Sequence, residues 1–270
     1  MLKPANEAAV DELWQAAAHR IGGSLEIVKG SFLRDTIRQI SAGVEGVPLT
    51  VEAYTDSSGK NRVWHTRVAA GRLPASGAVR IECSPRGIVG KLSKRLGISR
   101  QLTGDEAFDD ACHIDASPAA MGLAFFDAPT RRLVSTLGEG FTLEHGRVSV
   151  VREGLPADSS VLVDMTRFVE RLIERWCALV ESLVHIAAAL DLVCEWDFSV
   201  PSEGESVVAR GLRRAPTTTL LVRVSGDAIE TVVRIGDAEV AFAGLAPVVA
   251  AVVSAVEAAA DRSATASTYR

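Results

Sequence analysis

The chain has 270 residues, 47% of them apolar, and a formal net charge of −5. This apolar content suffices for a packed core and argues against disorder, while the acidic balance disfavours nucleic acid as a partner. The first residues lack a hydrophobic signal core, and segment 245–260 is too short to cross a bilayer and contains Glu257, so we expect a soluble, cytoplasmic protein with no stable membrane insertion.

The first half of the chain is predicted to begin with a helix and to continue as antiparallel strands. Residues 7–21 place their apolar side chains on one helical face, and Gly22-Gly23 ends that helix. Alternating apolar and polar residues predict strands over 47–54, 62–69 and 79–83, and their short connections favour antiparallel pairing. Further along are a short strand at 112–115, helices at 119–126 and 129–137, and a hairpin at 141–151 around His145-Gly146.

The longest segment with one unbroken period is 158–190, which predicts a central helix. Asp158 is a helix-capping residue at its start. About 30 residues make a helix of roughly 45 Å, long enough to carry a sheet along its length. Its apolar face is formed by residues spaced alternately by four and three: Met165, Val169, Leu172, Trp176, Leu179, Leu183 and Ile186.

The second half is predicted to return to strands and to end in a helix of small residues at 246–260, with a frayed tail at 261–270. We therefore predict an α+β fold in which antiparallel sheets from both halves pack on the central helix, with smaller flanking helices. An N-terminal α+β region, 1–157, and a C-terminal part, 158–260, either stand as two domains or form one continuous domain. Both halves run helix, strands, helix, which a diverged duplication would produce, although no residue-level repeat is visible. The predicted strands are 206–212, 218–224, 229–235 and 239–243.

Polar residues gather between 105 and 115, where Asp109, His113 and Asp115 are candidate metal ligands. Their spacing matches no metal motif. A turn and helix cap, with Gly104 in a tight bend and Asp109 accepting backbone N–H groups, is the preferred interpretation. A metal-dependent enzyme using this cluster is the alternative. Nucleophile, phosphate-loop and dinucleotide motifs are lacking, so we predict no catalytic residue and no cofactor.

A basic segment without acids precedes that cluster, and it could contact an anion or an acidic partner. The preferred interpretation is a solvated loop that balances the acids after it. The alternative is a membrane-surface adaptor that binds anionic lipid. Its cations are Arg86, Lys91, Lys94, Arg95 and Arg100.

The distribution of the cysteines indicates the redox state of the protein's compartment. Cys83, Cys112, Cys177 and Cys194 are scattered, which is typical of reduced core thiols in a cytosolic protein.

Helix 246–260 carries valines on more than one face, and burying the second face against a symmetry mate predicts a homodimer.

Several short motifs in the first two thirds of the chain occur in a characteristic order. Trp14 lies in a helix that ends at Ile21-Gly22-Gly23, and it is followed by a strand entered through Gly46-Val47-Pro48-Leu49 and a strand with Thr66-Arg67-Val68. Next come Leu96-Gly97 and the turn Thr103-Gly104-Asp105 with Phe108-Asp109. The last motifs are the extended stretch Ala111-Cys112-His113-Ile114 and a helix with Arg131-Arg132-Leu133. The pattern resembles a family of uncharacterised bacterial cytosolic proteins with a TRV strand and a TGDxxFD turn. The resemblance implies kinship of fold and transfers no catalytic residue, since no activity is attached to that family.

The sequence as a whole contains core and turn residues but no catalytic constellation. We therefore expect a non-enzymatic binding or assembly protein with a protein partner.

Overall fold

A computed structural model describes residues 7–29, 36–56, 63–86, 103–196, 205–211, 217–225, 228–236, 238–244, 247 and 249–268. It confirms the α+β class, with two antiparallel sheets. The helices are α1 (Glu7–Ile21), α3 (Glu106–Ala111), α4 (Ala119–Phe125), α5 (Ala128–Leu137), α6 (Ser159–Ala189) and α7 (Val249–Thr268).

The larger sheet has eight strands in the order β1-β2-β3-β4-β8-β7-β5-β6, and the smaller has five in the order β13-β12-β11-β10-β9. The strands of the larger sheet are β1 (Ser24–Val28), β2 (Ile37–Val44), β3 (Val47–Asp56), β4 (Val63–Gly71), β5 (Arg80–Pro85), β6 (Cys112–Ser117), β7 (Phe141–Glu144) and β8 (Arg147–Glu153). Those of the smaller are β9 (Val193–Cys194), β10 (Glu205–Arg210), β11 (Thr218–Ser225), β12 (Ala228–Ile235) and β13 (Ala238–Ala243).

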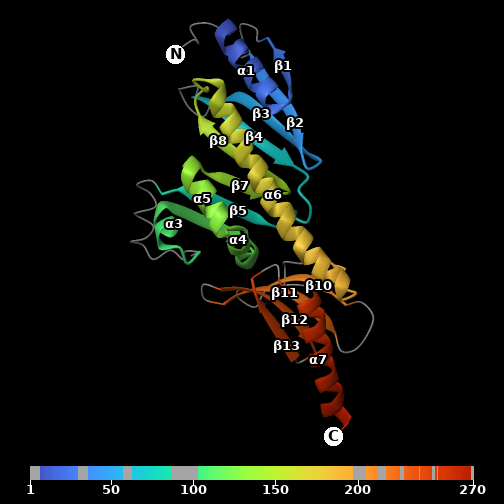
Figure 1. Cartoon of the computed structure of the whole chain (residues 1–270). Coiled ribbons are helices and arrows are strands. Elements are labelled where there is room, and N and C mark those ends of the chain that lie inside the picture. The colour runs from blue at the N-terminus through green and yellow to red at the C-terminus, as the bar shows by residue number, and fades with distance from the viewer. Residues whose placement is uncertain are drawn as a thin grey trace.

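Helix α6 connects the two sheets, as predicted for the central helix (Figure 1). Asp158 is its N-cap and accepts a hydrogen bond from the backbone N–H of Ser160 at 2.7 Å. Its apolar stripe is buried from Leu162 to Ala187, against β4 and β8 at one end and β9 and α7 at the other. Buried side chains of both sheets belong to one contiguous core around this helix.

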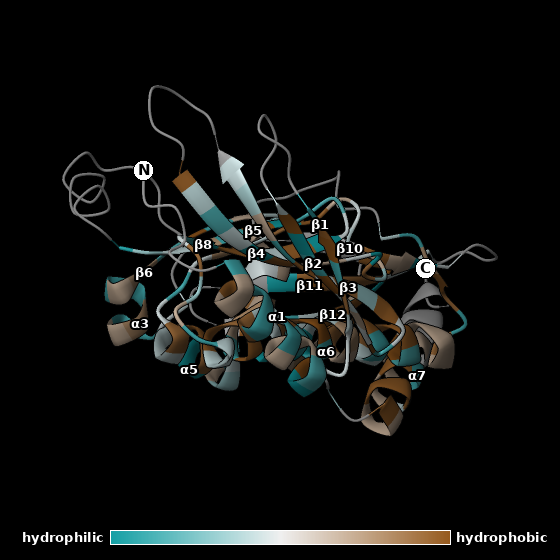
Figure 2. Ribbon diagram, turned by 90° about the horizontal axis from the view of Figure 1, so that it is seen from above, coloured by the Kyte–Doolittle hydropathy of each residue, from teal (hydrophilic) through white to brown (hydrophobic). Residues whose placement is uncertain are grey.

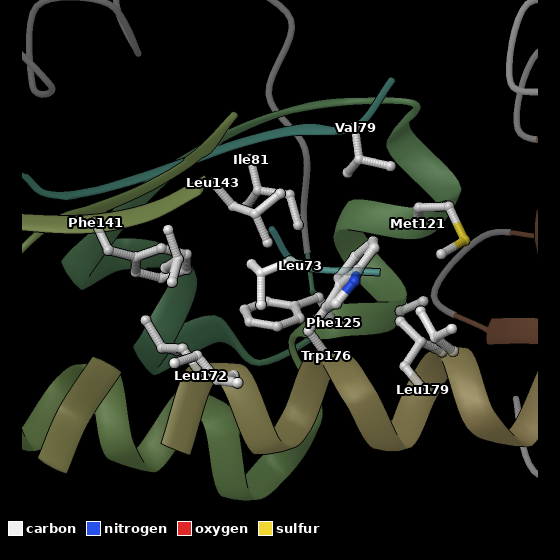
Figure 3. Close-up of a cluster of buried hydrophobic side chains, with 14 of the residues drawn as sticks. Leu73, Val79, Ile81, Met121, Phe125, Phe141, Leu143, Leu172, Trp176 and Leu179 are labelled. Carbon is white, nitrogen blue, oxygen red and sulfur yellow. The ribbon is translucent and has the colours of Figure 1, made fainter. Parts of the chain in front are cut away.

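An aromatic cluster fills the core between α6 and the large sheet (Figure 3). Trp176 is fully buried, and its indole N–H donates to the carbonyl of Pro74 at 2.6 Å, so the one polar atom of the ring is satisfied. Phe125 from α4 lies 6.2 Å from Trp176 and 5.9 Å from Phe141 of β7 between ring centroids. These contacts join a helix, a strand and the central helix into one packing unit.

Arg175 connects the segment between α4 and α5 to α6. Arg175 of α6 donates to the carbonyls of Ala124 at 2.8 Å and Phe125 at 3.3 Å, and it pairs with Asp127 at 3.3 Å. Burial lowers the pKa of Arg175, an effect that the Asp127 charge opposes. The guanidinium therefore satisfies carbonyls at the end of α4 that the helix itself leaves unpaired.

The structure adds elements that the sequence pattern does not predict, namely β1, β2 and β9. The buried positions of β2 include Arg38, so the strand lacks a plain apolar alternation. Helix α7 continues to Thr268, into the tail predicted to be frayed, because no glycine or proline follows Pro247 and alanines favour the helix. Within the described residues, no helix combines the length and apolarity that crossing a membrane requires.

Candidate functional site

The described helices cover only one face of the large sheet (Figure 2). Seen from above, α1, α3, α5, α6 and α7 all lie on the same side of the strands, and no described helix lies on the other side (Figure 2). We call this other side the open face. Cross-strand pairing places small side chains next to one another across its middle, roughly 19 Å over five strands at the usual strand spacing: Ser41, Thr50, Ala69, Ser149 and Thr142.

Large apolar side chains are exposed at one end of the open face, which we call the apolar end. Val28 of β1 and Ile37 of β2 lie directly opposite each other and are 51% and 50% exposed. Val151 of β8 lies opposite Arg67 and is 42% exposed. Strand alternation puts all three on the open face, and they are three of the five large apolar side chains that are exposed in the described part of the chain. The other two are Val184 and Val193.

Aromatic and charged side chains of β3 and β4 lie between Ile37 of β2 and Val151 of β8. The rings of Tyr54 and His65 are stacked with centroids 5.4 Å apart. The guanidinium of Arg67 sits 5.2 Å from the Tyr54 ring centroid and donates from Nε to Glu52 Oε1 at 2.6 Å. Arg67 contacts both the Tyr54 ring and the Glu52 carboxylate, so the side chains of this part of the open face hold one another in place.

The other end of the open face contains a pocket of about 320 Å³, which we call the basic pocket. It lies where β4 ends and the β7–β8 hairpin turns, and the N–H of Leu73 donates to the carbonyl of Gly146 at 3.1 Å to hold the two segments together. The lining residues are Pro48, Thr50, Ala69, Gly71, Arg72, His145, Gly146 and Arg147.

The basic pocket has two residues other than glycine in the left-handed region, Arg72 at φ 65° and His145 at φ 50°. His145 and Gly146 (φ 74°) form the tight hairpin turn whose twist matches the strands on either side. Arg72 has no such reason, and its conformation costs about 1–2 kcal/mol for a side chain of this size. That conformation keeps Arg72 at the rim of the pocket, directly after β4.

The charge of the basic pocket is uncompensated at two positions. In the described part of the chain, the guanidinium groups of Arg72 and Arg147 have no carboxylate partner. His145 Nε2 is 3.7 Å from Glu144 Oε1 and is 86% exposed, so it has a weak partner. Two unpaired guanidinium groups over a shallow, partly apolar wall are suited to hold an oxyanion.

A neighbouring cluster on the open face is acidic. Arg80 is surrounded by three carboxylates, with distances of 3.0 Å to Glu82, 3.3 Å to Asp115 and 3.8 Å to Glu144. All four side chains are about half exposed. The open face therefore has four parts: the apolar end, the middle row of small side chains, the basic pocket and this acidic cluster.

The predicted metal candidates lie in different places. Asp109 is buried on α3, and both of its carboxylate oxygens accept from the Thr103 N–H, at 3.0 and 3.1 Å. His113 and Asp115 lie on β6, where Asp115 pairs with Arg80. Among the described residues, no three His, Cys, Asp or Glu side chains come together as a metal site requires.

The 103–111 region instead has the geometry of a turn and helix cap. Asp105 is the N-cap of α3 and accepts from the Phe108 N–H at 3.2 Å, while Arg131 of α5 donates to its other oxygen at 3.1 Å. The Phe108 hydrogen bond and the Arg131 charge hold the pKa of Asp105 below its ordinary value. Gly104 bends the chain at φ 79°, where a side chain would be strained.

Of the predicted basic segment, only Arg86 belongs to the described part; it is half-buried, and its N–H donates to the Ala111 carbonyl at 2.7 Å. Lys91, Lys94, Arg95 and Arg100 lie outside the described residues.

All four cysteines are free, and Cys83 and Cys112 are buried on adjacent strands. The hydrogen bond between these two thiols and burial raise the pKa of Cys83, whereas the same hydrogen bond and the Arg86 charge lower the pKa of Cys112. Cys112 therefore ionises first, but an exposed fraction of 7% keeps it from reagents in solution.

The valines of α7 are less exposed than the dimer prediction assumes. Val252 is buried, and Val249, Val253 and Val256 are half-buried. Self-association through this helix stays a prediction.

The basic pocket could not be predicted from the sequence, because its two arginines come from segments that are far apart in the chain. Arg147 pairs with Gly71 only through the β4–β8 ladder. The available signal was His145-Gly146 between two strands, which locates the turn but not its neighbour.

Comparisons with protein-family models, with curated proteins and with solved structures find no match to this chain. The resemblance carried by the TRV strand and the TGDxxFD turn stays an expectation.

Proposed function

We propose that this chain is a non-enzymatic binding or assembly protein of the bacterial cytoplasm, and that it binds a protein partner on its open face. The observation that carries the proposal is the exposure of Val28, Ile37 and Val151 on the one sheet face that no described helix covers. Exposed apolar side chains that gather on one face mark interaction surfaces more often than scattered ones do.

The rest of the open face fits a protein partner. The middle row of small residues leaves room for another chain, and the flanking charges are held in ion pairs such as Arg67–Glu52. Protein–protein interfaces usually combine apolar contacts with polar and charged groups in this way. The stacked Tyr54 and His65 and the adjacent Arg67 add aromatic and arginine side chains, which interfaces favour.

The experiment compares two exposed valines in affinity purification from the native cell with mass spectrometry. Val151→Glu puts a charge on the open face, whereas Val184→Glu puts the same charge on α6, where Val184 is 38% exposed against 42% for Val151. A stoichiometric protein that is captured by the wild type and by Val184→Glu, but not by Val151→Glu, supports the proposal. Equal capture by both variants contradicts it, provided that both melt as the wild type does.

Two predictions from the sequence are tested on the same purified protein. Light scattering coupled to gel filtration measures the mass, and a monomer at micromolar concentration contradicts the predicted homodimer. Elemental analysis of protein purified without chelator decides the metal-enzyme alternative. Near-stoichiometric zinc, manganese or iron that is lost in His113→Ala would favour that alternative.

A further inference from the structure

We infer that the basic pocket is an anchor for an acidic group, and that the partner supplies it as a carboxylate on an extended acidic segment. The inference rests on the proposed function, because the pocket lies on the open face, and it names the chemistry of the partner at that end. The occupant is a carboxylate-bearing stretch of protein, and free phosphate is the competing source of the same oxyanion chemistry.

Charge is the first reason. Arg72 and Arg147 line one pocket and have no carboxylate partner in the described part of the chain, although the chain carries 34 acidic residues against 29 basic ones. Glu144 is the cross-strand neighbour of Arg147, but its carboxylate lies near Arg80 at 3.8 Å and His145 at 3.7 Å and forms no ion pair with Arg147. Two free guanidinium groups in a net acidic protein create a local positive field, which an acidic ligand would complement.

Shape is the second reason. The pocket has a volume of about 320 Å³, the size of a site for a small polar group, and Pro48 and Ala69 give it a partly apolar wall. Thr50 and Ala69 also belong to the row of small residues that crosses the open face. A segment lying along this row would therefore reach the pocket without climbing over a large side chain.

Backbone conformation is the third reason. Arg72 is held at φ 65°, directly after the last residue of β4, while the Leu73 N–H is fixed to the Gly146 carbonyl. This arrangement keeps the Arg72 segment beside the hairpin turn that carries Arg147. Two arginines whose backbones are held side by side need less rearrangement to bind one carboxylate together, which favours its recognition.

The test is a titration followed by the backbone amide NMR signals of Gly71 and Gly146, at constant ionic strength. The probes are acetylated hexaglutamate, acetylated hexalysine and inorganic phosphate. We expect hexaglutamate to shift both signals with saturation, hexalysine to leave them unchanged, and phosphate to bind at least tenfold more weakly than hexaglutamate. Phosphate that binds as tightly as the peptide, or hexaglutamate that does not saturate, overturns the inference.

The variants are Arg72→Asn with Arg147→Gln, and the control is Arg132→Gln, an exposed arginine on α5. Asparagine tolerates the left-handed conformation of Arg72, so the double variant should fold. We expect the double variant to weaken hexaglutamate binding at least fivefold and the control to leave it within a factor of two. Equal weakening in both overturns the inference, because it would show attraction to net charge alone.

Failure of this inference can be told apart from failure of the proposed function. If Val151→Glu abolishes capture of the partner but the double arginine variant does not, the open face is the docking surface and the acidic anchor is wrong. If neither change affects capture, the proposed function is wrong as well.

Discussion

The two faces of the large sheet are made from the same strands but have different roles. On β8, Val148 and Val150 point into the core and are fully buried, while Arg147, Ser149 and Val151 point the other way. Because side chains alternate along a strand, each covered position has an open neighbour one residue away. The covered face therefore sets stability, and the open face is free to change without unfolding the protein.

The largest expected effect is on the covered face. Leu179 is 2% exposed on α6 and lies in the cluster drawn in Figure 3. Leu179→Ala should lower the free energy of unfolding by about 2–5 kcal/mol, because it removes buried methyl groups and leaves a cavity. Urea unfolding measures this. The control is Glu174→Ala on the outer side of the same helix, which loses only the exposed Arg171–Glu174 pair and should cost less than about 0.5 kcal/mol.

A smaller effect is expected where α1 covers β2. Arg38 is 2% exposed, and its Nε donates to Asp11 Oδ1 at 2.8 Å; Nη2 lies 2.7 Å from the same oxygen without pointing at it closely enough for a hydrogen bond. Asp11→Asn removes the negative charge beside a buried cation and should cost about 1–3 kcal/mol at neutral pH. Glu12→Gln, on the exposed side of α1, is the control.

The same variant has a pH signature. Hydrogen bonds from Lys29 and Arg38 lower the pKa of Asp11 from its ordinary value of 3.8. A carboxylate with a lowered pKa in the folded state stabilises the fold above its unfolded pKa, and this contribution is lost as the pH falls through the folded value. The stability difference between wild type and Asp11→Asn should therefore be full above pH 5 and shrink below about pH 4. A difference that is constant from pH 7 to pH 3 would contradict the assignment.

A still smaller loss of stability is expected at the N-cap of α3. Asp105→Ala removes the acceptor for the Phe108 N–H and the partner of Arg131, and should measurably lower the free energy of unfolding. Glu106→Ala is one residue further along and exposed, so it should be nearly neutral. Urea unfolding of both variants measures the difference, and equal stability in the two would mean that the cap is unimportant.

The covered face was predictable from the sequence to a larger extent than the open face. The α6 stripe and the Asp158 cap are local patterns, and the helix begins and ends within a residue of its predicted bounds. The open face depends on which strands pair: β4 with β8 brings Arg147 beside Gly71, and β1 with β2 brings Val28 beside Ile37. Local periodicity does not show which distant segments pair. It does not predict β2 either, because the buried Arg38 interrupts the apolar alternation of that strand.

The smallest effect is expected on the open face itself, at Arg80. This side chain is 48% exposed and interacts with Glu82, Asp115 and Glu144. Exposed ion pairs contribute little at physiological salt, so Arg80→Gln should change the unfolding free energy by less than about 0.5 kcal/mol there. The substitution also leaves three carboxylates without their shared cation, and salt screens their mutual repulsion. The variant should therefore be measurably less stable than the wild type at 10 mM salt and equal to it at 500 mM salt. Thermal melts at these two concentrations test this. A loss that is as large at high salt as at low salt would mean that Arg80 stabilises the sheet by packing, and that the open face contributes to the stability of the fold after all.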